Sequence, residues 1–297
     1  MKRPAAIVLT TALSLVPSLA TVPAANAAFP GSNGDIAFGR FTHEQSDIWV
    51  VDADSTGTVR LTRTPRANEG MPDWNATGTR LAYSRCGRDE FSNCDIWAMN
   101  ADGSGATRLT STAAQETWPA WSPDGTMIAY TSNADDPSQD VYVMGADGTD
   151  QTRLTTTVGF DAFPDWSPDG TKIAFASDRD AFDDIWVMDA DGADPVRLTT
   201  GNRIDERPDW SPDGSRIAFS RDGNIWTMDA DGTDLTEVTS NPRFEFAPTF
   251  SPDGTTIAFN RETKDGRIGV WLMLPDGTGR IQQTFGTLDF FPDWQPV

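Results

Sequence analysis

The sequence predicts an all-β fold, a six-bladed β-propeller with four antiparallel strands in each blade. Three observations predict this fold. A proline-x-aromatic motif occurs six times at nearly equal intervals, each copy continues through the same series of turns and strands, and no helical periodicity follows the first 27 residues. The strands of one blade are called A, B, C and D below, with A innermost.

The motif places an aromatic residue two positions after a proline. Successive aromatic residues lie 47, 45, 44, 40 and 44 positions apart, which is the period of a four-stranded propeller blade. The six copies are Pro72-Asp73-Trp74, Pro119-Ala120-Trp121, Pro164-Asp165-Trp166, Pro208-Asp209-Trp210, Pro248-Thr249-Phe250 and Pro292-Asp293-Trp294.

Each copy of strand A continues through the same elements. In the third copy, a Ser-Pro-Asp-Gly turn at 167–170 is followed by strand B at 173–175 and strand C at 184–188, and then by an Asp-Gly turn and a short Arg-Leu-Thr strand D. Short apolar and β-branched runs bounded by Asp-Gly or proline indicate strands joined by hairpins.

The two ends of the chain carry complementary parts of one blade. The first predicted strand, at 36–38, is a strand B with no strand A before it, whereas the last, at 291–296, is a strand A with no strand B after it. We expect the C-terminal strand A to join the N-terminal strands B, C and D, which closes the ring and leaves no free edge.

Ten of the 11 tryptophans occupy two positions of the repeat, on strands A and C. A side chain repeated in every blade is most simply explained by packing between blades. The eleventh, Trp118, precedes a strand A proline, where other copies carry Met71, Phe163 and Phe291. It is a candidate contact residue for a ligand, and packing at the start of strand A is the alternative.

The repeat resembles that of the TolB propeller family, through Trp-Ser-Pro-Asp-Gly-x-x-Ile-Ala-Phe followed by Asp-Ile-Trp-x-Met-x-Ala-Asp-Gly. The resemblance covers residues 28–297 and implies a secreted propeller. TolB carries an α/β domain before its propeller, and a handful of residues separate Ala27 from the first predicted strand here. We therefore do not carry over the binding of TolA or of peptidoglycan-associated lipoprotein.

The first 27 residues have the pattern of a secretory signal peptide: Lys2 and Arg3, an apolar run at 5–19, and Ala25-Asn26-Ala27 as the cleavage motif. The run is too short to span a bilayer. We expect cleavage after Ala27, a periplasmic or extracellular location, no membrane insertion, and a single propeller domain at 28–297.

The mature chain is strongly acidic. Without Lys2 and Arg3, 21 of the 23 basic residues remain against 44 acidic ones, a formal charge of −23. This charge disfavours nucleic acid as a partner and favours cations or basic surfaces. Zinc and copper sites need His and Cys ligands, and the chain has one histidine, His43, and two cysteines. We therefore expect no cofactor other than, as one possibility, calcium held by oxygen atoms.

The two cysteines, Cys86 and Cys94, lie between strands B and C of one blade. In a secreted chain, an isolated pair across one hairpin predicts a disulfide.

An acidic residue stands three positions before each strand A proline. These residues are Glu69, Glu116, Asp161, Asp205, Glu245 and Asp289. We expect six carboxylates around one mouth of the central channel. At roughly 9 Å spacing their mutual repulsion would cost on the order of 3 kcal/mol without compensation. In one interpretation, each carboxylate accepts hydrogen bonds from backbone N–H groups of a neighbouring strand. In the other, the ring binds calcium or the basic end of a partner peptide.

The loops joining B to C and D to A differ between blades, whereas the A-to-B and C-to-D turns on the opposite rim are nearly uniform. We expect binding on the first face, named the variable face, around loops 86–94, 132–139 and 111–118. The leading hypothesis is a monomeric, non-catalytic binding or scaffold propeller for a protein, peptide or cell-envelope ligand. The alternatives are a calcium-dependent enzyme of the lactonase or esterase type, and an accessory propeller of a separate peptidase.

Overall fold

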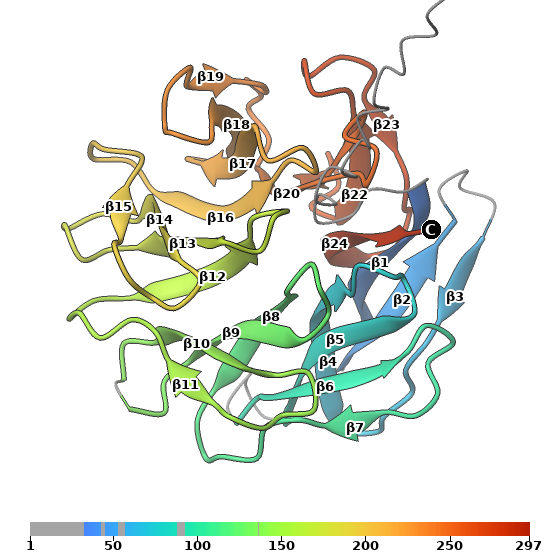
Figure 1. Cartoon of the computed structure of the whole chain (residues 1–297). Helices are drawn as coiled ribbons and strands as arrows, with labels where there is room; N and C mark the ends of the chain where they lie inside the picture. The colour runs from blue at the N-terminus through green and yellow to red at the C-terminus, as the bar shows by residue number, and fades with distance from the viewer. Residues whose placement is uncertain (1–32, 43–44, 53–56, 88–92, 136) are drawn as a thin grey trace, which may run out of the picture.

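A computed structural model describes residues 33–42, 45–52, 57–87, 93–135 and 137–297, and all of the elements in these ranges are β-strands (Figure 1). The predicted signal peptide and His43 lie outside the described residues. The described segments contain no helix with the length and apolarity needed to cross a membrane.

Four sheets contain four antiparallel strands each, consecutive in sequence. The first is β4 (Ala67–Trp74), β5 (Arg80–Gly87), β6 (Asp95–Asn100) and β7 (Thr107–Arg108). The second is β8 (Glu116–Trp121), β9 (Met127–Ser132), β10 (Asp140–Gly145) and β11 (Thr152–Arg153). The third is β12 (Asp161–Trp166), β13 (Lys172–Ser177), β14 (Asp184–Asp189) and β15 (Val196–Arg197). The fourth is β16 (Asp205–Trp210), β17 (Arg216–Arg221), β18 (Asn224–Asp229) and β19 (Thr236–Glu237).

The remaining eight strands form one sheet made of two antiparallel groups. One group is β20 (Glu245–Phe250), β21 (Ile257–Glu262), β22 (Ile268–Met273) and β23 (Ile281–Gln282). The other is β24 (Leu288–Pro296), β1 (Asn33–Thr42), β2 (Gln45–Val51) and β3 (Thr58–Arg60). A single parallel pair, Ile268 with Leu288, joins the two groups. The C-terminal strand β24 pairs antiparallel with β1, from Asn33 opposite Pro296 to Phe41 opposite Leu288.

The sheets lie around a common centre, with the strand A elements innermost (Figure 1). These strands contact one another in sequence: β4 contacts β8, β8 contacts β12, β12 contacts β16, β16 contacts β20, β20 contacts β24, and β24 contacts β4.

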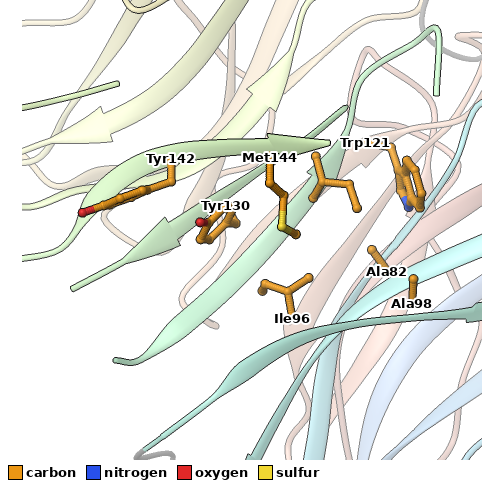
Figure 2. Close-up of a cluster of buried hydrophobic side chains, with 8 residues drawn as sticks. Ala82, Ile96, Ala98, Trp121, Tyr130, Tyr142 and Met144 are labelled. Carbon is orange, nitrogen blue, oxygen red and sulfur yellow. The ribbon is translucent and has the colours of Figure 1, made fainter. Parts of the chain in front are cut away.

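The core consists of apolar clusters between neighbouring sheets. Figure 2 shows one of them, in which Trp121 of β8 lies near Ala82 and Ala98 of the preceding sheet. The aromatic residues of strand A, from Trp74 to Trp294, are all buried, so the predicted packing role is confirmed for strand A. The strand C tryptophans are partly exposed and pack against the edges of these clusters. The Cys86–Cys94 disulfide is also confirmed.

The turns on the rim opposite the variable face are built on Asp-Gly. In the turn after β14, the N–H of Gly192 donates to the carbonyl of Asp189, and Gly192 has φ of +88°. This left-handed conformation favours glycine, which explains why the motif recurs in the C-to-D turns.

Candidate functional site

The site begins with a backbone irregularity shared by all six innermost strands. At the residue before each strand A proline, the pairing with strand B shifts register, because proline has no N–H to donate to a ladder. That residue has φ between 51° and 57° in each copy, which is uncommon for a residue other than glycine. The six residues are Met71, Trp118, Phe163, Arg207, Ala247 and Phe291.

Side chains of the adjacent strand group, β21 for Phe291 and β17 for Ala247, help to hold this conformation. The N–H of Phe291 donates to Asn260 Oδ1 at 2.7 Å, and the N–H of Ala247 donates to Ser220 Oγ at 2.9 Å. Because a bulge redirects a side chain, the six residues and the two that follow each of them line one narrow central cavity of about 100 Å³. We name this cavity the channel pocket.

An aromatic cluster surrounds a guanidinium group among these residues. Trp118 makes edge contacts with Phe163 and Phe291, with ring centroids 4.8 and 4.5 Å apart. The guanidinium of Arg207 lies 5.3 Å from the centroid of Trp118 and 4.7 Å from that of Phe163. Its Nη1 donates to Glu206 Oε2 at 2.6 Å. Burial lowers the pKa of Arg207, and Glu206 opposes this shift.

Trp118 therefore packs against the equivalent residues of other sheets, as one interpretation of the sequence expected. It also remains partly exposed and lines a second pocket described below, so it is available for contact with a ligand.

Four aspartates line the channel pocket immediately after the strand A prolines: Asp73, Asp165, Asp209 and Asp293. Each accepts a backbone N–H from the next innermost strand, at 2.6–2.7 Å; the donors are Trp121, Trp210, Phe250 and Trp74, respectively. The other two copies have Ala120 and Thr249 at this position. These carboxylates therefore connect neighbouring sheets.

The channel aspartates also hold protons more strongly than ordinary carboxylates. Burial raises the pKa of Asp165 to about 7 and that of Asp293 to about 8, although each accepts backbone hydrogen bonds that oppose the shift. Burial raises the pKa of Asp73 and of Asp209 well above the usual range, and in each case the charge of another channel aspartate adds to it. All four groups therefore keep their protons to a higher pH than an ordinary aspartate does.

In the sequence, Pro-Asp-Trp serves as a repeat marker, and these aspartates were not predicted as a site. The signal was present, because a charged residue recurs between a proline and a buried aromatic residue on the innermost strand.

The six carboxylates predicted to ring the channel mouth are almost completely buried at the starts of the innermost strands. Five of them form ion pairs with arginines of their own sheet: Arg85–Glu69, Arg179–Asp161, Arg221–Asp205, Arg261–Glu245 and Arg40–Asp289, at 2.6–3.1 Å. Each arginine lies over a strand C tryptophan, at 3.9–5.0 Å from the ring centroid. We name this arrangement the acid–arginine–tryptophan triad.

The triad supplies the compensation that five of the six carboxylates require, from guanidinium groups rather than from backbone N–H groups alone. The sixth carboxylate, Glu116, has no ion pair in the part of the chain that the structure describes. Over the same ranges, no group of three or more His, Cys, Asp or Glu side chains is placed to hold a metal ion.

A second pocket lies beside the channel pocket on the variable face and is mainly apolar. Its volume is about 480 Å³, and its walls include Phe41, Met71, Trp118, Leu288, Phe290 and Phe291. We name it the apolar pocket. Met71, Trp118 and Phe291 line both pockets.

Comparison with known proteins gives matches over nearly the whole chain. The family model for the TolB beta propeller domain matches residues 20–139 and 134–297. Comparison with curated proteins finds no match.

Among solved structures, TolB from Acinetobacter baumannii is similar with a TM-score of 0.77 and 23% identity, over 91% of this chain and 68% of that chain. A protein from Agrobacterium tumefaciens described as a putative TolB has a TM-score of 0.69 and 21% identity, over 89% and 91% of the two chains. Hydrazine synthase from Kuenenia stuttgartiensis has a TM-score of 0.75 and 16% identity, over 92% and 49%. These similarities concern the fold.

Proposed function

Because the chain belongs to the TolB β-propeller domain family, we propose that it is a secreted, non-catalytic propeller that binds a protein or peptide through its variable face and channel mouth. The observation that carries the proposal is the apolar pocket, about 480 Å³ in volume, next to the mouth of the channel pocket. A pocket of this size with mainly apolar walls accommodates side chains of a partner.

The rest of the variable face supports the same function. Large apolar side chains are exposed in its loops, including Val158 at 89% and Phe285 at 72% exposure, together with Phe182, Ile204 and Phe244. These side chains add apolar surface to the face on which the apolar pocket opens. The acidic charge of the chain adds a preference for a basic or cell-envelope-associated partner.

The architecture we propose for residues 28–297 is a single domain with six blades in a closed ring. Two observations support it: the innermost strands contact one another in a complete cycle from β4 through β24 and back to β4, and β24 pairs with β1. The eight-stranded sheet then represents two blades joined by one parallel pair.

The enzymatic alternative of the lactonase or esterase type needs a free carboxylate base and, in the calcium-dependent version, a group of oxygen ligands. The channel aspartates already accept backbone N–H groups. Five of the six carboxylates at the starts of the innermost strands are paired with arginine. Both arrangements favour binding over hydrolysis.

Binding of calcium by the six carboxylates at the starts of the innermost strands is a separate proposal, and calorimetry tests it directly. Calorimetric titration of metal-free protein with calcium should show heat, and the melting temperature should rise, if calcium binds. No heat and no change in melting temperature at millimolar calcium would remove this version.

Photo-crosslinking in the native envelope tests the proposed function. A photoreactive residue at Phe41 or Trp118 should capture one defined protein, whereas the same residue at Leu274, on the opposite rim, should not. Capture from Leu274 alone would contradict the proposal. A captured peptidase would identify the chain as an accessory propeller.

A further inference from the structure

Four of the six groups of strands carry the same ion pair on their two outer strands. An aspartate two positions before the strand C aromatic residue pairs with the strand D arginine that lies opposite that aromatic residue, at 2.5–2.8 Å. The pairs are Asp47–Arg60, Asp95–Arg108, Asp140–Arg153 and Asp184–Arg197. In these groups a carboxylate and a guanidinium therefore fill the space between strands C and D at the variable face.

The group formed by β20, β21, β22 and β23 carries other residues at both positions. Gly269 stands two positions before Trp271, in place of the aspartate. Gln282 lies opposite Trp271, in place of the arginine. This group therefore cannot form the ion pair, and the glycine leaves the space of a side chain open.

The frame around these two positions is the same as in the other groups. The N–H of the residue after the aspartate position donates to a strand D threonine in all six, at 2.9–3.0 Å, and here Val270 donates to Thr284. Gln282 Nε2 donates to the carbonyl of Thr284 at 2.8 Å, as Arg197 Nε donates to the carbonyl of Thr199 at 2.8 Å. The groups therefore differ here in their side chains and not in the path of their strands.

An open pocket of about 210 Å³ lies where the ion pair is missing, and we name it the polar pocket. Its walls include Gly269 and Gln282, together with Thr263, Asp265, Arg267 and Phe285. Residues 263–267 form the hairpin between β21 and β22, and Phe285 lies in the connection between β23 and β24. The polar pocket therefore opens on the variable face.

The hairpin presents two opposite charges to the polar pocket. Asp265 and Arg267 are both exposed, and neither forms an ion pair with any residue that the structure describes. The turn fixes their positions, because the N–H of Thr263 donates to the carbonyl of Arg267 at 2.7 Å and that of Gly266 donates to the carbonyl of Thr263 at 3.1 Å. A carboxylate acceptor and a guanidinium donor are thus free to bind a ligand.

Phe285 supplies an apolar face beside these polar groups. Its side chain is 72% exposed. An aromatic ring offers a large flat apolar surface, and Gln282 and Thr263 line the same pocket with an amide and a hydroxyl group. The polar pocket therefore suits a ligand that has one apolar face and a polar edge.

We propose that the polar pocket binds a pyranose sugar residue. A pyranose ring has a face of C–H groups and an edge of hydroxyl groups, each of which both donates and accepts hydrogen bonds. The face would stack on Phe285, and the hydroxyl groups would donate to Asp265 and accept from Arg267. A small anion or cation fits less well, because Asp265 repels the first and Arg267 the second. An apolar ligand would leave both groups without hydrogen bonds.

This inference goes beyond the proposed function and does not depend on it. Ile268 lines the polar pocket and pairs with Leu288, which lines the apolar pocket. The two pockets therefore lie on either side of one strand pair, and a sugar and a protein partner would occupy separate sites.

NMR titration of the mature protein with the methyl pyranosides of glucose, galactose, mannose and N-acetylglucosamine tests the site. At least one should shift the side-chain resonances of Gln282 and Phe285 and saturate, with a dissociation constant of about 1–10 mM for a ligand of this size. Sorbitol, an open-chain polyol without a ring face, should not saturate. If none of the pyranosides saturates at these residues, or if sorbitol binds equally well, the site does not bind a pyranose.

The source of the sugar is separated by a linear trisaccharide of the sugar that binds. Equal or tighter binding of the trisaccharide indicates a residue within a glycan, and loss of binding indicates a free sugar. Both results support a pyranose site.

Single substitutions identify the groups that hold the sugar. Phe285→Ala and Asp265→Ala should each weaken binding about tenfold, because the first removes the stacking face and the second removes the acceptor for the hydroxyl groups. The matched control Phe182→Ala removes an exposed phenylalanine from another loop of the variable face and should bind as the wild type does. Wild-type affinity in both pocket variants would overturn the assignment.

Restoring the ion pair gives an independent test. Gly269→Asp combined with Gln282→Arg places the residues of the other groups in the polar pocket, so the variant should fold with at least the melting temperature of the wild type and lose sugar binding. A folded variant that binds the sugar as before would show that the polar pocket is not the site. Photo-crosslinking at Phe41 and Trp118 does not involve the polar pocket, so this proposal and the proposed function fail separately.

Discussion

At the scale of single residues, the channel aspartates connect neighbouring sheets by hydrogen bonds, although burial makes their charged form costly. Asp165 lines the channel pocket and accepts the N–H of Trp210 at 2.7 Å, so it connects two sheets. Its burial makes the charged form costly, and its pKa rises to about 7. The hydrogen bond does not require the charge, because a protonated carboxyl group still accepts through its carbonyl oxygen.

This property predicts the pH dependence of stability. The folded state of Asp165 and Asp293 binds protons more tightly than an unfolded aspartate of pKa 3.8. The contribution of these two groups to the free energy of unfolding is therefore greatest at or below the unfolded pKa of 3.8. This contribution is lost as the pH rises through about 7 and 8. The melting temperature should be higher at pH 5 than at pH 8.5.

Asp165→Asn should reduce this difference and stabilise the protein at pH 8.5 by on the order of 3 kcal/mol, because the amide oxygen still accepts the N–H of Trp210 without a buried charge. Chemical unfolding at the two pH values measures the effect. Asp169→Asn, in the exposed turn of the same repeat, should leave the difference unchanged. A protein that is equally stable at both pH values would contradict the assignment.

The triads predict a second effect at the residue scale. Arg221 binds both oxygens of Asp205 at 2.6 Å, and both side chains are almost completely buried. Arg221→Ala leaves a buried carboxylate without its partner and should cost about 3–5 kcal/mol. Urea unfolding should show a loss of less than about 1 kcal/mol for Arg203→Ala, whose pair with Asp222 is exposed. Similar losses for both variants would show that the triad is not an important source of stability.

The arginines of the triads were the part of the site that the sequence could not identify, whereas the channel aspartates had a sequence signal that was not used. Arg85 and Glu69 lie 16 positions apart, and their contact depends on the register between β4 and β5. The left-handed conformation of Trp118 and Phe163 contradicts local preference and is imposed by the bulges and by neighbouring sheets.

At the scale of elements, the sequence was a better guide. The turns contain Asp-Gly, and strands B and C are short and apolar, so local chemistry predicts the hairpins. The disulfide joins the end of β5 to the residue before β6, with Cys86 and Cys94 both buried.

Replacing both cysteines by alanine should lower stability by about 2.5 kcal/mol, because the closed loop no longer restricts the unfolded chain. Equilibrium unfolding measures the loss, and reduction of the wild-type protein should reproduce it. If the oxidised wild type and the double variant unfold at the same denaturant concentration, the disulfide does not stabilise the fold.

For the whole molecule, the period of the repeat predicted the arrangement of the sheets because each repeat has the same inner and outer strands. The contacts of the last strand bear most directly on the proposed closure of the ring. Strand β24 pairs with β1 and also contacts β4 and β20. The loops of the variable face follow no repeat, so the apolar pocket could not be derived from the period.

Removal of residues 291–297 tests closure. The deletion eliminates Asp293 and Trp294, the inter-sheet hydrogen bond to Trp74, and half of the pairing with β1. The melting temperature should fall strongly, and addition of a peptide with residues 288–297 should restore part of it. A truncated protein with the melting temperature of the full chain would show that β24 does not close the ring.

The central claim is that a protein partner binds the variable face through the apolar pocket. Titration calorimetry with the partner captured at Trp118 tests it most directly, with the double variant Phe41→Ala/Trp118→Ala compared with Leu235→Ala/Leu274→Ala, which removes exposed leucines from the opposite rim. We predict that the first variant weakens binding about tenfold or more, since buried aromatic anchors carry most of the energy of an interface, and that the second binds as the wild type does. Unchanged affinity in the first variant with a loss in the second would contradict the claim.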